Sequence, residues 1–419
     1  MNKTSISFAI ALSAIFATNA IAAKAPTHHS LRAESMGNAH VAVVDDKEAI
    51  YFNYAGLNQI NRLGNYDKRP EQGYYPRNYI DMRLNFGGAG PFETYFSTYK
   101  EAVDLQDMYK RVNKAADANG LSRSNVLIDS LSTHPELIKT LNNYDHKNLS
   151  MQVKMDAELA VHNFGGALWI NGTVSPYLDA GLVLPYLAVD TFYIDAVAQA
   201  GIAYGITDDF SIGLGVKAAK REKVEMIVVD IANYESIKDT LDDRFDDATD
   251  DMFDKNTLSM GLDFGLLYQL TREVRIGASL RDVYFKELAG DKITPDFTIG
   301  VNYSPIFFNT NTGYARKFNV ALDYADAFDS ERNYKPLSHI NFGVELEQNL
   351  LAWPGLNNQL RILAVRLAAG FRGGYPSAGA SIEVLRVFTF EFATWAEERG
   401  YYTGQDEERI YMGEISLGF

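Results

Sequence analysis

The chain has 419 residues, a formal net charge of −15, 25 tyrosines, 24 phenylalanines and no cysteine. The acidic balance argues against nucleic acid as a partner, because phosphate binding needs a basic face. The lack of cysteine excludes disulfides, thiolate metal sites and lipidation on a cysteine.

Residues 1–23 predict a cleaved secretory signal peptide. Lys3 supplies a positive charge, residues 6–16 form a short apolar run, and Ala20-Ile21-Ala22 is a small-residue cleavage site. The run is shorter than the roughly 20 residues that cross a bilayer. No later apolar run reaches that length, so the mature chain is expected to be either soluble outside the cytoplasm or a membrane barrel of strands.

Residues 24–75 lack the alternation of a membrane strand and predict a compact hatch, or plug, inside or under a barrel. Asp45-Asp46 predicts the N-cap of a short helix, and residues 53–56 predict the turn that leaves it. The two histidines at 28 and 29 are expected to lie in a solvated tail. The residues assigned to the plug are Met36, Gly37, Ala39, Asp45, Asp46, Asn53, Ala55, Gly56 and Leu57.

The pattern Met-Gly-x-Ala at 36–39, Asp-Asp at 45–46 and Asn-x-Ala-Gly-Leu at 53–57 resembles the N-terminal hatch of FadL-like barrels, the fatty-acid-transporter type. That family usually has proline where this chain has Tyr54. The resemblance implies a Gram-negative outer-membrane barrel with a plugged lumen, assembled by the barrel-assembly machinery and surrounded by outer-membrane lipid. It also implies a hydrophobic ligand such as a fatty acid, taken up by loop helices, passed to an apolar pocket beside the hatch and released sideways through the wall.

Residues 76–419 predict the barrel, because apolar and polar residues repeatedly alternate with a period of two. The clearest examples are residues 80–86 and 149–161. Similar runs occur at 192–204, 210–216, 258–266, 274–280, 297–303, 318–324, 340–346, 363–371 and 378–392. With ambiguous pieces near 92–98, 164–187 and 222–230, they predict an antiparallel all-β barrel of about 12 to 16 strands, and about 14 as the central value. Charged residues on the polar faces are expected to line the lumen: Asp81, Arg83, Lys154, Asp156, Glu158, Arg275, Arg281 and Arg366.

Two insertions break this rhythm. Residues 99–143 predict an amphipathic helical cap in which Leu105, Met108 and Val112 share a face that either contacts ligand or packs on the barrel rim. Residues 234–255 predict a second helix, with nine acids and two bases between 235 and 254. A solvated helix face is favoured over a cation site there, because calcium loops carry acids at alternate positions and a turning glycine. The layout resembles, more loosely, the conjugal-transfer TraF-type branch of these barrels.

The end of the chain predicts one more strand and a barrel-assembly signal. Tyr411, Ile415, Leu417 and Phe419 share one face, while Glu414 and Ser416 share the other. A last strand that ends on phenylalanine is typical of bacterial outer-membrane barrels, and the many aromatic residues fit their two interfacial girdles.

A search for catalytic signatures finds no nucleophile elbow, no His-Glu-x-x-His and no phosphate-binding glycine loop. We therefore expect that the protein is not an enzyme and that it has no metal site and no cofactor. Three hypotheses remain: passive uptake of hydrophobic molecules, an envelope component of a conjugation or secretion apparatus with protein partners, and a membrane hydrolase built around His162. The first is favoured and the third is the least supported.

Overall fold

The structure is a computed structural model. It describes residues 26–60, 80–90, 114–115, 117–120, 126, 150–161, 163–179, 186–224, 227–230, 258–283, 287–289, 291–305, 307, 316–328, 336–353, 360–385, 387–398, 404 and 407–418.

Strands make up most of the described chain. They are β1 (Ile80–Gly90), β2 (Met151–Val161), β3 (Phe164–Asp179), β4 (Tyr186–Gly205), β5 (Phe210–Val224), β6 (Ile227–Asp230), β7 (Ser259–Gln269), β8 (Val274–Val283), β9 (Glu287–Leu288), β10 (Asp291–Lys292), β11 (Asp296–Tyr303), β12 (Arg316–Tyr324), β13 (Ile340–Trp353), β14 (Leu360–Arg372), β15 (Tyr375–Val384), β16 (Phe388–Glu398) and β17 (Glu407–Gly418).

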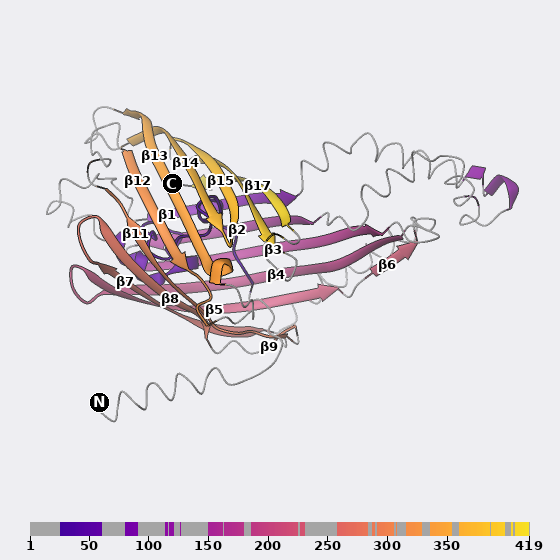
Figure 1. Ribbon diagram of the computed structural model, residues 1–419, viewed down its shortest axis with the longest axis horizontal. Coiled ribbons are helices and arrows are strands. Elements are labelled where there is room, and N and C mark those ends of the chain that lie inside the picture. Colours follow the sequence, from indigo (N-terminus) through magenta and orange to yellow (C-terminus); the bar gives the residue numbers. More distant parts are fainter. Residues whose placement is uncertain are drawn as a thin grey trace, which may run out of the picture.

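Fourteen of these strands close into one antiparallel barrel (Figure 1). Their order around the ring is β3-β2-β1-β17-β16-β15-β14-β13-β12-β11-β8-β7-β5-β4, and the pairing of β3 with β4 closes it. Strand β6 follows β5 and pairs with the first residues of β4, while β9 and β10 form a separate hairpin. The predicted antiparallel barrel of 14 strands is confirmed.

The two faces of the wall differ as they do in a membrane barrel. On β1, Leu84 and Phe86 point outward with 44% and 48% of their surface exposed. On the neighbouring strand β2, Lys154, Asp156 and Glu158 are buried on the inner side. A soluble barrel would place its apolar side chains inside, so this wall is built to face lipid. Among the described residues, no helix is long and apolar enough to cross a membrane.

Strand direction places the C-terminal ends of β1 and β5 at the same end of the barrel. Because neighbouring strands are antiparallel, β1, β3 and β5 run in one direction. In the sequence, the predicted helical cap falls between β1 and β2, and the predicted acidic helix falls after β6. Of the cap, residues 114–115 and 117–119 are helical and Gly120 has a φ of +62°. The other cap residues and 234–255 lie outside the described residues.

Residues 26–60, here called the inner segment, lie between the walls of the barrel, as the indigo ribbon in Figure 1 shows. The segment contains α2 (Leu31–Ser35), α3 (Ala49–Phe52), η1 (Tyr54–Gly56) and α4 (Leu57–Ile60), and a further short helix, η5 (Pro336–His339), joins β12 to β13. Ser30 caps α2 by accepting a hydrogen bond from the backbone N–H of Ala33 at 3.2 Å. Helix α2 packs against β14–β17, and η1 packs against β4, β5 and β7.

Glycines in the strands let the inner segment touch the wall. Gly201 and Gly215 face each other across β4 and β5, and a Cβ on either would collide with the ring of Tyr54. A Cβ on Gly213 would collide with the backbone between Tyr54 and Ala55. Other inward glycines in similarly close contact with the segment are Gly165, Gly265, Gly277, Gly343, Gly370 and Gly379. Since any side chain here would need the space that the segment fills, the segment sits directly on wall backbone.

Three local predictions are wrong. Residues 378–392 form not one run but the hairpin β15–β16, with Leu385 at the turn in the left-handed region (φ 54°). The N-cap of α3 is Glu48 rather than Asp45 or Asp46; Asp46 instead accepts a hydrogen bond from the N–H of Glu48 at 3.0 Å in the turn before the helix. The pair at 28 and 29 is not a solvated tail, since only 6% and 12% of the two side chains is exposed.

Candidate functional site

The contact between the inner segment and the barrel wall is the candidate site, and Arg32 of α2 is its main ionic anchor. The guanidinium forms two hydrogen bonds to Glu345 of β13, from Nε to Oε2 at 2.6 Å and from Nη2 to Oε1 at 2.7 Å. Its Nη1 contacts Asp45 at 3.2 Å and Asp46 at 2.6 Å. Burial acts to lower the pKa of Arg32, but Glu345 and Asp46 hold it well above its ordinary value. A buried guanidinium that is fully paired in this way fixes the register of α2 on the wall.

Further ion pairs tie the segment to other strands. Lys47 pairs with Glu158 of β2, and Asp45 pairs with Lys317 of β12. Glu34 contacts Arg372 of β14 at 2.5 Å. Burial raises the pKa of Glu34, but Arg372 and His29 outweigh it and the net shift is downward. The anchors therefore come from strands on several sides of the lumen.

Backbone groups of the inner segment also bind wall side chains. Asp323 of β12 accepts hydrogen bonds from the N–H groups of His40 and Val41, at 2.6 and 2.8 Å. Asn53 donates to the carbonyls of Val41 and Leu266, at 3.0 and 2.9 Å, and accepts from the N–H of Ala55 at 3.1 Å. The amide of Asn53 thus joins two turns of the segment to β7, which gives this position a physical reason to be asparagine.

His28 lies in an aromatic layer against the wall. Its ring stacks on Tyr51 with centroids 3.6 Å apart and meets Trp169 of β3 edge-on at 5.7 Å. Nε2 lies 3.3 Å from Oδ2 of Asp156. Burial lowers the pKa of His28 to about 4, Lys154 adds to that effect, and Asp156 opposes it. The imidazole is therefore neutral at neutral pH while the segment is in place.

An apolar seam runs between the segment and the wall. Its residues are Val44, Ala49, Ile50, Tyr51, Tyr54, Ala55 and Leu57 of the segment with Ala160, Ala167, Trp169, Val197, Ala203, Ala219, Leu267, Val283, Leu288 and Ile293 of the barrel and its connections. Leu288, in the β9–β10 hairpin, has no exposed surface. Fully burying each large apolar side chain contributes about 1.5–3 kcal/mol. The seam therefore holds the segment in place together with the ion pairs.

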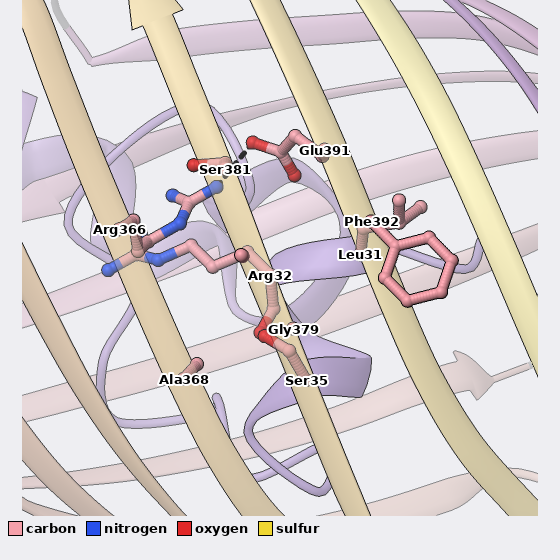
Figure 2. Close-up of a pocket in the computed structure, with 10 residues that line it drawn as sticks. Leu31, Arg32, Ser35, Arg366, Ala368, Gly379, Ser381, Glu391 and Phe392 are labelled. Carbon is pink, nitrogen blue, oxygen red and sulfur yellow. Dashed lines mark hydrogen bonds and ion pairs between the residues drawn. The ribbon is translucent and has the colours of Figure 1, made fainter.

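A small cavity lies where α2 meets β14, β15 and β16 (Figure 2). Leu31, Arg32 and Ser35 line it from the segment, and Arg366 and Glu391, which form an ion pair, line it from the wall. Its volume is about 10 Å³, enough for roughly one water molecule. This cavity is too small and too polar to hold a fatty acid.

The structure places the predicted plug residues on the lumenal contact. Met36, Ala39, Ala55 and Leu57 have no exposed surface. Gly37 has a φ of +64° and would carry its Cβ into the backbone of Phe371. Gly56 is packed on Val44 within the segment.

The described lumen-lining residues all engage polar partners on the inner side. Arg83 contacts Thr389 at 2.7 Å and Glu383 at 3.3 Å, and Lys154 contacts Glu414 at 2.5 Å. Arg275 and Arg281 donate to the carbonyls of Val43 and Tyr51, at 3.3 and 3.2 Å. On β17, Ile415 and Leu417 point outward, and Tyr411, nearer the start of the strand, is half-buried. Leu105, Met108, Val112, His162, Phe419 and the side chain of Asp81 lie outside what the structure describes.

Sequence reasoning missed several residues that hold the segment. Arg32 and Asp323 carry no spacing that marks them, and Glu345, which the alternation places on the polar face of residues 340–346, has no spacing that pairs it with Arg32. Trp169 was in a stretch too ambiguous to assign. The inward glycines did leave a signal, because a glycine within a strand marks a bulge or a close backbone approach.

No protein-family model matches the chain, and a search of curated proteins finds no match. Among solved structures, the chain is similar to the toluene transporter TbuX of Ralstonia pickettii, with a TM-score of 0.45, 12% identity, and coverage of 93% of this chain and 97% of that one. It is also similar to the toluene transporter TodX of P. putida, with a TM-score of 0.40, 9% identity, and coverage of 94% and 97%. The chain is thus a closed antiparallel barrel of 14 strands that is similar over most of its length to solved toluene transporters.

Proposed function

We propose that this protein is a FadL-like channel of the Gram-negative outer membrane. It takes up hydrophobic small molecules passively, and residues 26–60 act as a plug that moves to open the path. The observation that carries the proposal is the apolar seam between the inner segment and the wall of a closed barrel. A polar lumen repels an apolar solute, whereas this seam offers a continuous apolar surface once the segment moves aside.

The contacts of the plug suit a part that moves without unfolding the barrel. The strands form a closed ladder of hydrogen bonds around the ring, and none of these strand pairings involves the segment. Seam, ion pairs and backbone hydrogen bonds between segment and wall are all noncovalent, since the chain has no cysteine. Loops and lids that gate a site are drawn from such separable units.

The proposal includes the surroundings of the protein. Outer-membrane lipid covers the outward side chains, and the last strand, with Tyr411, Ile415, Leu417 and Phe419, serves as the signal for the barrel-assembly machinery. The signal peptide directs export and is then cleaved. The ligand belongs to the class of apolar molecules, with a fatty acid as the type.

A disulfide lock tests whether the plug must move. Because the chain has no cysteine, Ser35→Cys with Ser377→Cys introduces one defined pair between the segment and β15. The hydroxyl of Ser377 donates to the carbonyl of Ser35 at 3.2 Å, and both residues already carry a Cβ, so neither substitution forces a new atom into the segment's backbone. Uptake of a radiolabelled long-chain fatty acid into proteoliposomes is expected to stop when the pair is oxidised and to return on reduction.

The matched control is Gly166→Cys with Ala200→Cys, which joins β3 to β4 at a Cβ separation of 3.7 Å without touching the plug. That lock is expected to leave uptake unchanged. Equal uptake through the oxidised and reduced plug lock would show that the path avoids the segment. No uptake by the reduced protein would remove the channel proposal, leaving a conjugation or secretion-apparatus component as the alternative.

A further inference from the structure

We infer that the inner segment carries a binding site for one zinc-like divalent cation, formed by His40, Glu48 and Asp46. The ligating atoms of these three side chains lie within 4.8 Å of one another. One imidazole nitrogen with two carboxylates suits zinc and its first-row neighbours better than calcium or magnesium, which prefer oxygen ligands alone. This inference does not depend on the proposed transport function.

Local folding brings the three residues together. His40 begins a turn in which its carbonyl accepts hydrogen bonds from the N–H groups of Val43 and Val44, at 3.0 and 3.3 Å. The chain then returns so that Glu48, at the start of α3, faces His40. Asp323 holds the start of the turn through the N–H of His40 at 2.6 Å, and the His40 ring packs on Phe52 at 5.1 Å. The position of the imidazole is therefore fixed by backbone and packing rather than by its own nitrogens.

The polar atoms that face one another are the second, independent observation. His40 is completely buried, yet within the described residues neither of its ring nitrogens has a hydrogen bond. Oε2 of Glu48 lies 3.0 Å from Nε2 of His40, an ion-pair distance, and among the described residues neither atom has a further hydrogen-bond partner. A buried polar atom without a partner is costly, because folding removes its hydrogen bond to water. A cation between Nε2 and Oε2 would satisfy both atoms.

The remaining contacts orient the ligands. Ser30 donates its hydroxyl to Oε1 of Glu48 at 2.7 Å, which turns Oε2 towards His40. Asp46 accepts from the N–H of Glu48 through Oδ1 at 3.0 Å and from Arg32 through Oδ2 at 2.6 Å. Each carboxylate oxygen has two lone pairs, so Asp46 keeps capacity for a metal beside these bonds. Small side-chain movements suffice to reach the roughly 2.0–2.2 Å bonds of a zinc site.

A cation at this site would join the two arms of the turn between His40 and Glu48. Its effect would be to stiffen the middle of the inner segment. Because all three ligands belong to the segment itself, the cation would stabilise this folded turn by mass action.

The test uses the whole protein, purified in detergent, stripped with EDTA and titrated with Zn²⁺ by calorimetry and by dialysis with elemental analysis. The expected result is one bound zinc per chain. His40→Ala and Glu48→Gln should each weaken binding by at least about tenfold. Asp45→Asn is the matched control, because it also removes one carboxylate charge, beside Arg32 and Lys317, and Asp45 is not one of the three ligands. The affinity of this variant for zinc should stay within about twofold of the unmodified protein.

A second control separates this site from the other grouping of a histidine and carboxylates in the described lumen, His28 with Asp156 and Glu158. Cu²⁺ is added to His28→Ala at less than one ion per chain. Its electron paramagnetic resonance spectrum should still show coupling to one imidazole nitrogen, because His40 is unaltered in this variant. The inference is overturned if no zinc binds stoichiometrically, if Asp45→Asn weakens binding as much as Glu48→Gln, or if His28→Ala abolishes the nitrogen coupling.

Discussion

Arg32 and Glu345 form a two-point ion pair, with Nε 2.6 Å from Oε2 and Nη2 2.7 Å from Oε1, across a sequence separation of 313 residues. Both side chains are buried: Glu345 is 1% exposed to solvent and Arg32 is 2% exposed. The pair fixes α2 against β13, so it ties the position of the whole inner segment to the wall.

Glu345→Gln is expected to loosen the segment. The substitution keeps the size of the side chain but leaves the buried guanidinium without its main counter-ion, and breaking a buried pair costs about 3–5 kcal/mol. Hydrogen exchange of residues 31–44 should become faster by several orders of magnitude, while exchange in the barrel strands stays slow. Mass spectrometry of peptic fragments measures both at once.

The control for this substitution is Glu407→Gln. Glu407 pairs with Arg409 at 2.5 Å but is 43% exposed, and exposed pairs contribute about 0–1 kcal/mol. Unchanged exchange in Glu345→Gln would mean that the Arg32–Glu345 pair is not what holds the segment.

Gly213→Val is expected to displace the segment from β5. The new side chain would occupy the space of the backbone between Tyr54 and Ala55, so either the segment or the strand must move to admit it. Valine favours strands, so the barrel itself should remain intact. Conductance of single channels in planar bilayers should rise, because the lumen is no longer filled by the seated segment.

Gly413→Val is the matched control on β17, where a Cβ meets nothing within 4 Å. It should fold and conduct as the unmodified protein does. If both variants conduct alike, contact between Gly213 and the segment does not govern closure.

Acidification is expected to weaken the seat of the segment. The pKa of His28 is lowered to about 4 by burial when the segment is in place, against an ordinary value of 6.5 when it is released. The released form therefore takes up a proton first, and stability is lost as pH falls from about 6.5 to about 4. The loss at pH 5 is on the order of 2 kcal/mol. Glu34, whose pKa is lowered in the seated form, acts in the same direction at lower pH.

Protease cleavage within residues 26–60, followed from pH 7.5 to pH 5 with an acid-tolerant protease, measures this effect. His28→Gln removes the titrating group while retaining a hydrogen-bonding side chain, so it should flatten the dependence above pH 5. An equally steep profile in His28→Gln would assign the pH response to other groups.

The sequence was sufficient to predict the strands because lipid imposes one demand on every outward position. On β2, Val153 and Met155 face lipid, and the charge of Lys154 between them can face only the lumen. The alternation of apolar and polar residues is therefore enough to predict that Lys154, Asp156 and Glu158 face the lumen. The extent of single strands was harder, because the turn at Leu385 interrupts an apolar run without a proline or a glycine.

The partners across the lumen could not be predicted. An inward charge such as Glu345 has many sterically possible partners in a closed barrel, and its choice of Arg32 depends on where the inner segment comes to rest. The pair at 28 and 29 was read as a solvated tail because no periodicity marks a short extended stretch. Its burial depends on Trp169 and Tyr51, which only the folded wall brings beside it.

Leu168→Lys is expected to impair insertion into membranes. Leu168 lies within β3 on the outward face with 63% of its surface exposed, and a lysine on the lipid face costs up to about 2–4 kcal/mol, most at the bilayer midplane. The folded fraction in lipid vesicles, read from the shift between heated and unheated samples on a gel, should fall. Leu337→Lys is the control, because Leu337 is equally exposed, at 68%, but lies in η5 outside the strands. Equal folding of the two variants would contradict the assignment of the outer face to lipid.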